Sequence, residues 1–277
     1  GSDTDAPPTL VDNAETLAHV TVALAEGADW FREVGTDESP GTVLCTVSGN
    51  VNQAAVGEFP MGTPLREIIE TLGGGTRPGR TIRAVLQGAA AAIITADQLD
   101  TPASWEGMQA IGSGLGAAAF IVLDDATDIA AVAASVSRFL AVESCGQCTP
   151  CKQDSLLITD ALTHIATSAG SEDDLDVVRH RIDTVAFGAR CSLATQEQVV
   201  VGSFLDVFGD ELEARVEHHA HRGAALAIVP MVDLRDGVAV LDDEHARKQP
   251  DWTYAEHWSG KAPADRLDDH RSHHEDL

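Results

Sequence analysis

Four of the five cysteines form a pattern that restricts the folds open to this chain. Cys145, Cys148 and Cys151 follow one another with gaps of two residues, and Cys191 comes after 39 further residues. A triplet at this spacing wraps the backbone around one face of a cubane, and a thiolate from another segment closes the site. We therefore expect a [4Fe–4S] cluster, which requires the fold to bring the triplet next to Cys191. A zinc ion, which ordinarily uses two separated cysteine pairs, and inert thiols are the alternatives.

The residues around these cysteines suit a cluster. Gly146 lets backbone N–H groups approach sulfide atoms, and Pro150 fixes the loop. Lys152 and Arg190 each adjoin a predicted ligand, where their positive charge would offset the negative charge of a thiolate-bound cluster. The alternative is that both are ordinary surface cations. Cys191 comes directly before a predicted helix, whose free N–H groups help to hold an anionic ligand.

The fifth cysteine, Cys45, lies in an apolar segment with Val43, Leu44 and Val47. We interpret it as a small buried hydrophobic residue, and as a substitute fourth ligand only if Cys191 fails. This many cysteines without a secretion signal indicate a reducing compartment. We therefore expect a location in the cytoplasm, or on the cytoplasmic side of a membrane-associated complex.

The charge of the chain excludes several classes of partner. It carries 18 Lys and Arg against 44 Asp and Glu, a net charge of −26. Such a surface repels phosphate backbones and anionic lipids, so we expect no nucleic acid partner. The longest apolar stretches, 88–96 and 114–123, are about half the length of a transmembrane helix, so we expect no membrane insertion. The start at Gly1–Ser2 without Met suggests a fragment of a longer protein.

The first half of the chain combines β-branched segments with short helices. A single helix is predicted over residues 13–31, and a second from Pro64 to Leu72 with Thr63 as its N-cap. Extended segments are predicted over residues 42–48, 54–59, 82–86 and 119–123, the first two as a hairpin. This β-β-α-β order is typical of a β-grasp module.

The second half has the periodicity of amphipathic helices. Helices are predicted over residues 128–142, 154–167, 171–185 and 196–208, which together indicate a four-helix bundle. Asp236–Gly237 predicts a hairpin turn between extended segments 225–234 and 238–241. From Asp242 onward we expect an arm or a disordered tail. Its histidines, and those at positions 218–221, lack the cysteines or patterned carboxylates of a metal site, so we expect solvated side chains.

Three segments resemble one known family. The segment Glu143–Lys152 with Cys191–Leu193 resembles the cluster signature of the NADH-binding flavoprotein subunit of respiratory complex I, a subunit type shared with NAD-linked hydrogenases and formate dehydrogenases. Residues 8–16 resemble the segment that closes the family's flavin site, and residues 113–124 the strand that leads into its bundle. The resemblance spans roughly residues 7–220, which is only the C-terminal part of a full member. The glycine-rich loop of the flavin- and NADH-binding domain is not found, so we do not expect this chain alone to hold NADH.

The resemblance implies an α+β fold in which a β-grasp module of the soluble-ligand-binding (SLBB) type precedes a four-helix iron–sulfur bundle. The expected boundaries are 1–34 for a linker and helix, 35–126 for the β-grasp module, 127–220 for the [4Fe–4S] domain and 221–277 for a hairpin and His-rich tail. Asp12 and Asn13 stand where the family has two Asn near the flavin phosphate. Asn13 is a candidate contact to FMN, the alternative being a helix N-cap.

The implied function is electron transfer. One cluster would relay single electrons from FMN, reduced by NADH, to an iron–sulfur acceptor elsewhere in a multi-subunit oxidoreductase. No residues of this chain are predicted to be catalytic. The alternatives are a ligand- or partner-binding scaffold with a structural metal site, and a ferredoxin-like carrier that serves a flavin-free partner.

Overall fold

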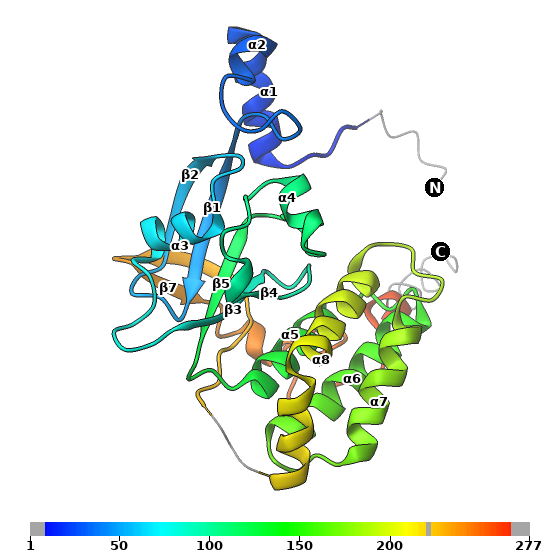
Figure 1. Ribbon diagram of the computed structural model, residues 1–277. Helices are drawn as coiled ribbons and strands as arrows, with labels where there is room; N and C mark the ends of the chain where they lie inside the picture. The colour runs from blue at the N-terminus through cyan, green and yellow to red at the C-terminus, as the bar shows by residue number, and fades with distance from the viewer. Residues whose placement is uncertain (1–8, 220–222, 267–277) are drawn as a thin grey trace, which may run out of the picture.

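The computed structural model describes residues 9–219 and 223–266 of the chain. A sheet-containing half and a helical half lie side by side, and the C-terminal segment returns across both (Figure 1). The molecule is therefore of the mixed α+β class, as expected. None of the helices in the described part of the chain is both long and apolar enough to span a membrane.

The first half is built on a five-stranded sheet with the order β2-β1-β5-β3-β4. Strands β1 and β2 form the predicted antiparallel hairpin, whereas β1 and β5 run parallel at the centre. Strand β3 pairs antiparallel with both β5 and β4. The strands span Thr42–Gly49 (β1), Ala55–Pro60 (β2), Ile82–Gln87 (β3), Ile94–Thr95 (β4) and Ala119–Asp124 (β5). The predicted extended segments are thus confirmed, with the short β4 added at the edge.

One face of this sheet is covered by α3 (Leu65–Gly73). Its buried side chains pack against Cys45 and Val47 of β1, because alternate residues of a strand share one face. The predicted N-cap was wrong by one residue: Pro64 takes this place, and the Thr63 hydroxyl donates to the carbonyl of Pro60 instead. The helix α4 (Trp105–Ala110) and the 3₁₀ turn η1 (Ala96–Gln98) complete this half.

The second half contains four packed helices, α5 (Ile129–Glu143), α6 (Thr149–Ala166), α7 (Glu172–Val185) and α8 (Leu193–His218). Asp128 caps α5, and Ser171 forms a capping box at the start of α7, so both begin where the sequence predicted. The other two are longer than predicted: α6 starts five residues earlier, and α8 continues ten residues further across a kink at Phe208. The early start of α6 places two cysteines on its first turn.

The predicted helix over residues 13–31 is interrupted. Gly27 takes a φ of 98°, which ends α1 (Ala14–Glu26) and separates it from the single turn α2 (Ala28–Phe31). No residue of either helix is buried. The sequence missed the break because its apolar residues continue past the glycine at helical spacing.

The C-terminal segment corrects another prediction. Strands β6 (Met231–Arg235) and β7 (Val238–Leu241) form the predicted hairpin around Asp236–Gly237. The chain then follows the surface of the bundle through η2 (His245–Arg247), and His245, Asp251 and Ala262 are buried. The prediction of an arm or disordered tail is therefore wrong for residues 242–266. His221, His270, His273 and His274 lie outside the described residues.

Candidate iron–sulfur site

The four predicted ligands lie where three helices end or begin. The backbone leaves α5 after Glu143, and Cys148 serves as the N-cap residue of α6. Pro150 lies at the first positions of α6, where its missing N–H costs no helical hydrogen bond. Cys191 is separated from the start of α8 by one residue, as predicted. Cys148, Cys151 and Cys191 therefore lie at two helix N-termini, each with free N–H groups, and Cys145 lies in the loop before α6.

The thiols form one electrostatic group. Cys151 is buried, Cys145 and Cys148 are half-buried, and Cys191 is exposed; all four are free thiols. Burial raises the pKa of the Cys151 thiol, the nearby Ser144 hydroxyl lowers it, and interactions with the other three cysteines raise it further. Thiolates that lie close together repel one another unless positive charge is nearby. A metal centre supplies that charge and binds its cysteine ligands in the deprotonated form.

The donor groups of the described residues can be compared with those that a single metal ion needs. Within the described residues, no group of three or more His, Cys, Asp or Glu side chains is placed to hold one metal ion. A cubane puts four irons and four sulfides between its ligands, so its thiolates stand further apart than those of mononuclear zinc. Cys45 lies in the core of the sheet-containing half, where burial raises its pKa to about 12. It is the buried hydrophobic residue that the sequence indicated.

The loop of the site is covered by the segment 242–266, which we call the C-terminal strap. Gly146 has a φ of 81°, and a Cβ atom built on it would lie 2.1 Å from the Cβ of Ala262. The Ala264 N–H donates to the carbonyl of Cys145 at 2.9 Å. Only glycine fits this close approach, so the strap and the cysteine loop are matched in shape.

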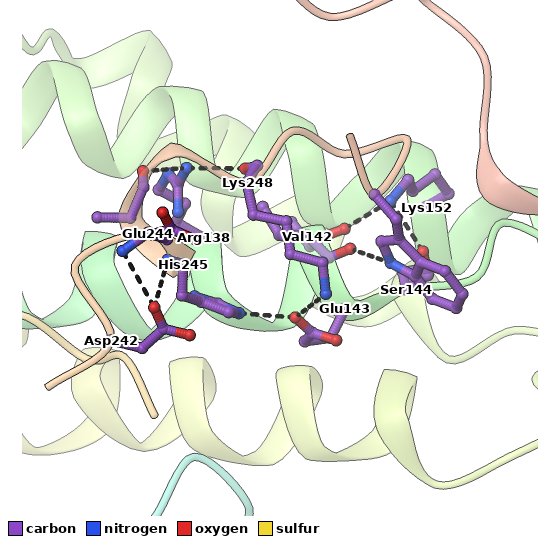
Figure 2. Close-up of polar contacts among 12 residues, drawn as sticks. Arg138, Val142, Glu143, Ser144, Lys152, Asp242, Glu244, His245 and Lys248 are labelled. Carbon is purple, nitrogen blue, oxygen red and sulfur yellow. Dashed lines mark hydrogen bonds and ion pairs between the residues drawn. The ribbon is translucent and has the colours of Figure 1, made fainter. Parts of the chain in front are cut away.

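Lys152 is the buried cation of the site. Its Nζ donates to the carbonyls of Ala141 and Ser144 at 2.8 and 2.9 Å (Figure 2). Burial lowers its pKa to about 8, and interactions with Cys151 and Cys145 act in the opposite direction. Arg190, in contrast, is exposed and donates to Gln147 at 3.3 Å. Of the two predicted cations, Lys152 is therefore the buried one.

The strap is held to α5 by a polar group that sequence reasoning missed. His245 and Lys248 both contact the same oxygen of Glu143 at 2.7 Å (Figure 2). Burial raises the pKa of Glu143, but the hydrogen bonds and the charges of Lys248 and His245 together lower it more, so the net shift is downward. Trp252 Nε1 donates to the carbonyl of Val142 at 2.8 Å. The strap thus covers the last turn of α5, directly before the first cysteine.

A second polar group was missed inside the bundle. Glu197 of α8 is fully buried, and Ser137 of α5 donates to its Oε1 at 2.7 Å. Its Oε2 and the hydroxyl of Ser155 have no hydrogen-bond partner among the described residues. Burial raises the pKa of Glu197 to about 8, partly offset by the hydrogen bond from Ser137. Glu197 follows Cys191 by six residues and Ser155 follows Cys151 by four, so this group lies one to two helical turns from the thiols along α8 and α6.

The predicted flavin contacts lie elsewhere. The Asn13 side chain accepts from the N–H of Glu15 as the N-cap of α1, and the Asp12 carboxylate accepts from the N–H of Asn13. Both residues are exposed. Asn13 also lines a cavity of about 410 Å³ between α1 and the sheet, together with His19 and Trp105.

A mixed fold with four cysteines near the ends of packed helices is the arrangement expected of an iron–sulfur protein. Two regions of the chain match known protein families. Residues 131–215 match the family described as the NADH-ubiquinone oxidoreductase-F iron-sulfur binding region, and residues 44–89 match the SLBB domain. These two regions of the chain thus match the iron–sulfur region of this oxidoreductase family and the SLBB domain, and the resemblance inferred from the cysteine signature is confirmed.

Individual relatives agree. The chain is 34% identical over 213 residues to an F-type NADH-quinone oxidoreductase subunit of Rhizobium meliloti, covering 76% of this chain and 51% of that protein. It is 33% identical to NADP-reducing hydrogenase subunit HndC of Solidesulfovibrio fructosivorans, covering 76% and 43%. The structure of an NAD⁺-reducing [NiFe]-hydrogenase in the H₂-reduced state matches with a TM-score of 0.67 and 30% identity, over 76% of this chain and 35% of that chain. The chain thus spans about half the length of the curated relatives it matches.

Proposed function

We propose that this chain is the electron-transfer part of an NADH dehydrogenase-type flavoprotein. Cys145, Cys148, Cys151 and Cys191 would hold one [4Fe–4S] cluster, which takes up and releases single electrons. The observation that carries the proposal is the electrostatic grouping of these four free thiols at the starts of α6 and α8, in a region that matches an iron–sulfur family. The chain's part is to fix the position of the cluster and to tune its potential.

The surroundings suit this role. The C-terminal strap limits water at the Cys145 side, because Ala262 lies directly on Gly146. Lys152 holds positive charge close to Cys151 and Cys145, which favours electron uptake by a negatively charged group. Cys191 is the exposed ligand, so the site is open on the side of the loop between α7 and α8.

The wider assembly is inferred from the relatives. Their names describe parts of NADH-quinone oxidoreductase and of an NADP-reducing hydrogenase, so we infer that electrons come from NADH through FMN and leave to an iron–sulfur acceptor on another polypeptide, on the cytoplasmic side. FMN and NADH would bind outside this chain, with Asn13 as its own candidate contact to the flavin. We assign 35–126 as a β-grasp module and 127–220 as the four-helix cluster domain; 1–34 would then be the linker and helix, and 221–277 the hairpin and tail. The SLBB and iron–sulfur matches support the two central assignments.

The test is anaerobic purification with iron counting and low-temperature EPR before and after dithionite. We expect about four irons per chain and a fast-relaxing signal on reduction. Cys148→Ser should lose the iron and loosen the contact between the cysteine loop and α6, whereas the matched variant Cys45→Ser should retain the iron. Zinc, or iron without a reducible signal, would refute electron transfer in favour of a scaffold with a structural metal. Full iron in Cys148→Ser would refute the ligand assignment.

A further inference from the structure

A cavity of about 560 Å³ lies between the sheet and the β6–β7 hairpin, away from the four cysteines of the candidate cluster site. Its floor is the sheet face opposite α3, and its other wall is the β6–β7 hairpin with the linker before it. Two hydrogen bonds hold this wall in place: the N–H of Ala54 donates to the carbonyl of Gly237 in the hairpin turn at 2.7 Å, and the N–H of Ile228 in the linker donates to Ser135 Oγ of α5 at 2.8 Å. Cavities of this size between parts of a protein are typical small-molecule sites, which span roughly 300–1,000 Å³.

The cavity follows from the strand pattern. Cys45 and Val47 point into the core under α3, so Thr46 and Ser48 face the opposite side. The sheet partners of Thr46 and Ser48 are Ala119 and Ile121 of β5, which also line the space. These side chains are mostly small, and Ala227 and Ala239 on the facing wall are small too. The two layers therefore leave room between them.

The charge of the lining sets this cavity apart. The chain has 44 acidic residues among 277, yet none lines this space, and its one charged residue is Arg77. Three further cavities in the described part of the chain each contain carboxylates, from Glu211, Glu213 and Glu15 respectively. An acid-free, Arg-bearing cavity in a chain of net charge −26 favours an anion over a cation.

The polar groups of the cavity are available to a ligand. Among the described residues, the guanidinium of Arg77 has no carboxylate or hydrogen-bonding partner, although Arg66, Arg80 and Arg83 each pair with a carboxylate. The hydroxyls of Thr46 and Ser48 likewise make no hydrogen bond to any residue that the structure describes. The remaining lining is predominantly aliphatic.

We propose that this cavity is a binding site for a small amphiphilic monoanion, a molecule with an apolar body and one carboxylate. The apolar body lies between the sheet and the hairpin, and the carboxylate meets Arg77 at the open side. Arg77 can form two parallel hydrogen bonds with a carboxylate, which gives the site its preference for an anion. The Thr46 and Ser48 hydroxyls add hydrogen bonds from the floor. The proposal is independent of the cluster, because none of its residues belongs to the cysteine site.

The test is isothermal titration calorimetry on the full chain, with octanoate as the probe and octanol as its uncharged comparator. We expect octanoate to bind more tightly than octanol, and Arg77→Gln to weaken octanoate about tenfold while leaving octanol unchanged. Ala239→Phe from the hairpin and Ser48→Leu from the sheet should each abolish binding of both probes by filling the space. Arg32→Gln, which removes an arginine outside the cavity that has no carboxylate partner among the described residues, is the matched control and should change nothing.

The outcomes are separable. Weaker octanoate binding in Arg77→Gln but not in Arg32→Gln, together with loss of binding in both filled variants, supports the site. Circular dichroism and the melting temperature establish that each filled variant is folded, and the two substitutions lie on opposite walls, so one misfolded variant leaves the other to decide. No binding by the wild-type chain at millimolar octanoate, or undiminished binding in a folded filled variant, would overturn the proposal.

Discussion

The buried carboxyl of Glu197 makes a quantitative prediction about stability. Glu197→Gln keeps the size of the side chain and an oxygen that can accept from Ser137, but it removes the titratable group. The new amide nitrogen would stand where Oε2 has no partner among the described residues, which costs about 1–3 kcal/mol at every pH. The informative quantity is therefore the change with pH in the stability difference between the variant and the wild type.

The magnitude follows from proton linkage. Burial raises the pKa of Glu197 from 4.5 in the unfolded chain to about 8 in the folded one. Between these values the folded state holds a proton that the unfolded state has released, so stability falls as the pH rises. The contribution is fully present below about pH 4.5, and roughly 3–4 kcal/mol of it is lost between pH 5 and pH 8. Glu197→Gln has no titratable group at this position, so its stability should not fall in this way as the pH rises.

The assay is thermal unfolding followed by circular dichroism at pH 5, 6, 7 and 8, under anaerobic conditions. In a chain of this size 1 kcal/mol corresponds to about 2–4 °C, so the variant should gain about 6–16 °C on the wild type as the pH rises from 5 to 8. Glu217→Gln removes an exposed carboxylate from the same helix and controls for the loss of one charge. Parallel pH profiles for Glu197→Gln and the wild type would show that the carboxyl is not held neutral by burial.

Two further predictions concern the cysteine loop and the sheet. Gly146→Ala should push the C-terminal strap away from the loop, because the new methyl would overlap Ala262 and the φ of 81° disfavours alanine. Limited proteolysis should then cut the variant within residues 242–266, where the wild type resists cleavage. The control is Gly188→Ala, which has open space at its Cβ and should leave the cleavage pattern unchanged. In the metal-free chain, iodoacetamide at pH 8 should alkylate Cys145, Cys148 and Cys191 rapidly. Cys45 should stay unmodified until denaturant is added, because burial raises its pKa to about 12. Mass spectrometry of tryptic peptides measures the alkylation of each cysteine, and early labelling of Cys45 would contradict its burial.

Local patterns predicted what depends on local sequence. Apolar periodicity predicted helices from residues 128 and 171, and α5 and α7 begin there with Asp128 and Ser171 as N-caps, which act within three residues. The strap was missed because its anchors join partners more than 100 residues apart, as in the contacts of Glu143 with His245 and Lys248. The aromatic residues at positions 252, 254 and 258 were the available signal that this polar segment has something to pack against.

Glu197 illustrates a different limit. It lies in the polar sequence Thr-Gln-Glu-Gln at the start of α8, which indicates a solvated first turn. Its neighbours Gln196 and Gln198 are half-buried, and only the rotation of α8 relative to α5 turns Glu197 inward. Helix periodicity predicts an inward face from apolar residues, so it cannot identify a charged residue on that face.

The two buried cations of the helical half have the same structural role. Lys152 donates to the last carbonyls of α5, at Ala141 and Ser144, whereas Arg215 donates to Ile165 and Ala166 at the end of α6. Carbonyls at the C-terminus of a helix lack intrahelical donors and carry the negative end of the helix dipole. A buried cation there donates hydrogen bonds to these carbonyls and places positive charge at the negative end of the dipole. Arg215 also pairs with Asp128, the N-cap of α5, and thereby ties the start of one helix to the end of the next. In a chain with only 18 basic residues, two are therefore committed to closing helix ends inside the bundle, one of them beside the cysteines. The backbone order at the candidate cluster site thus depends on the same electrostatics that hold the bundle together.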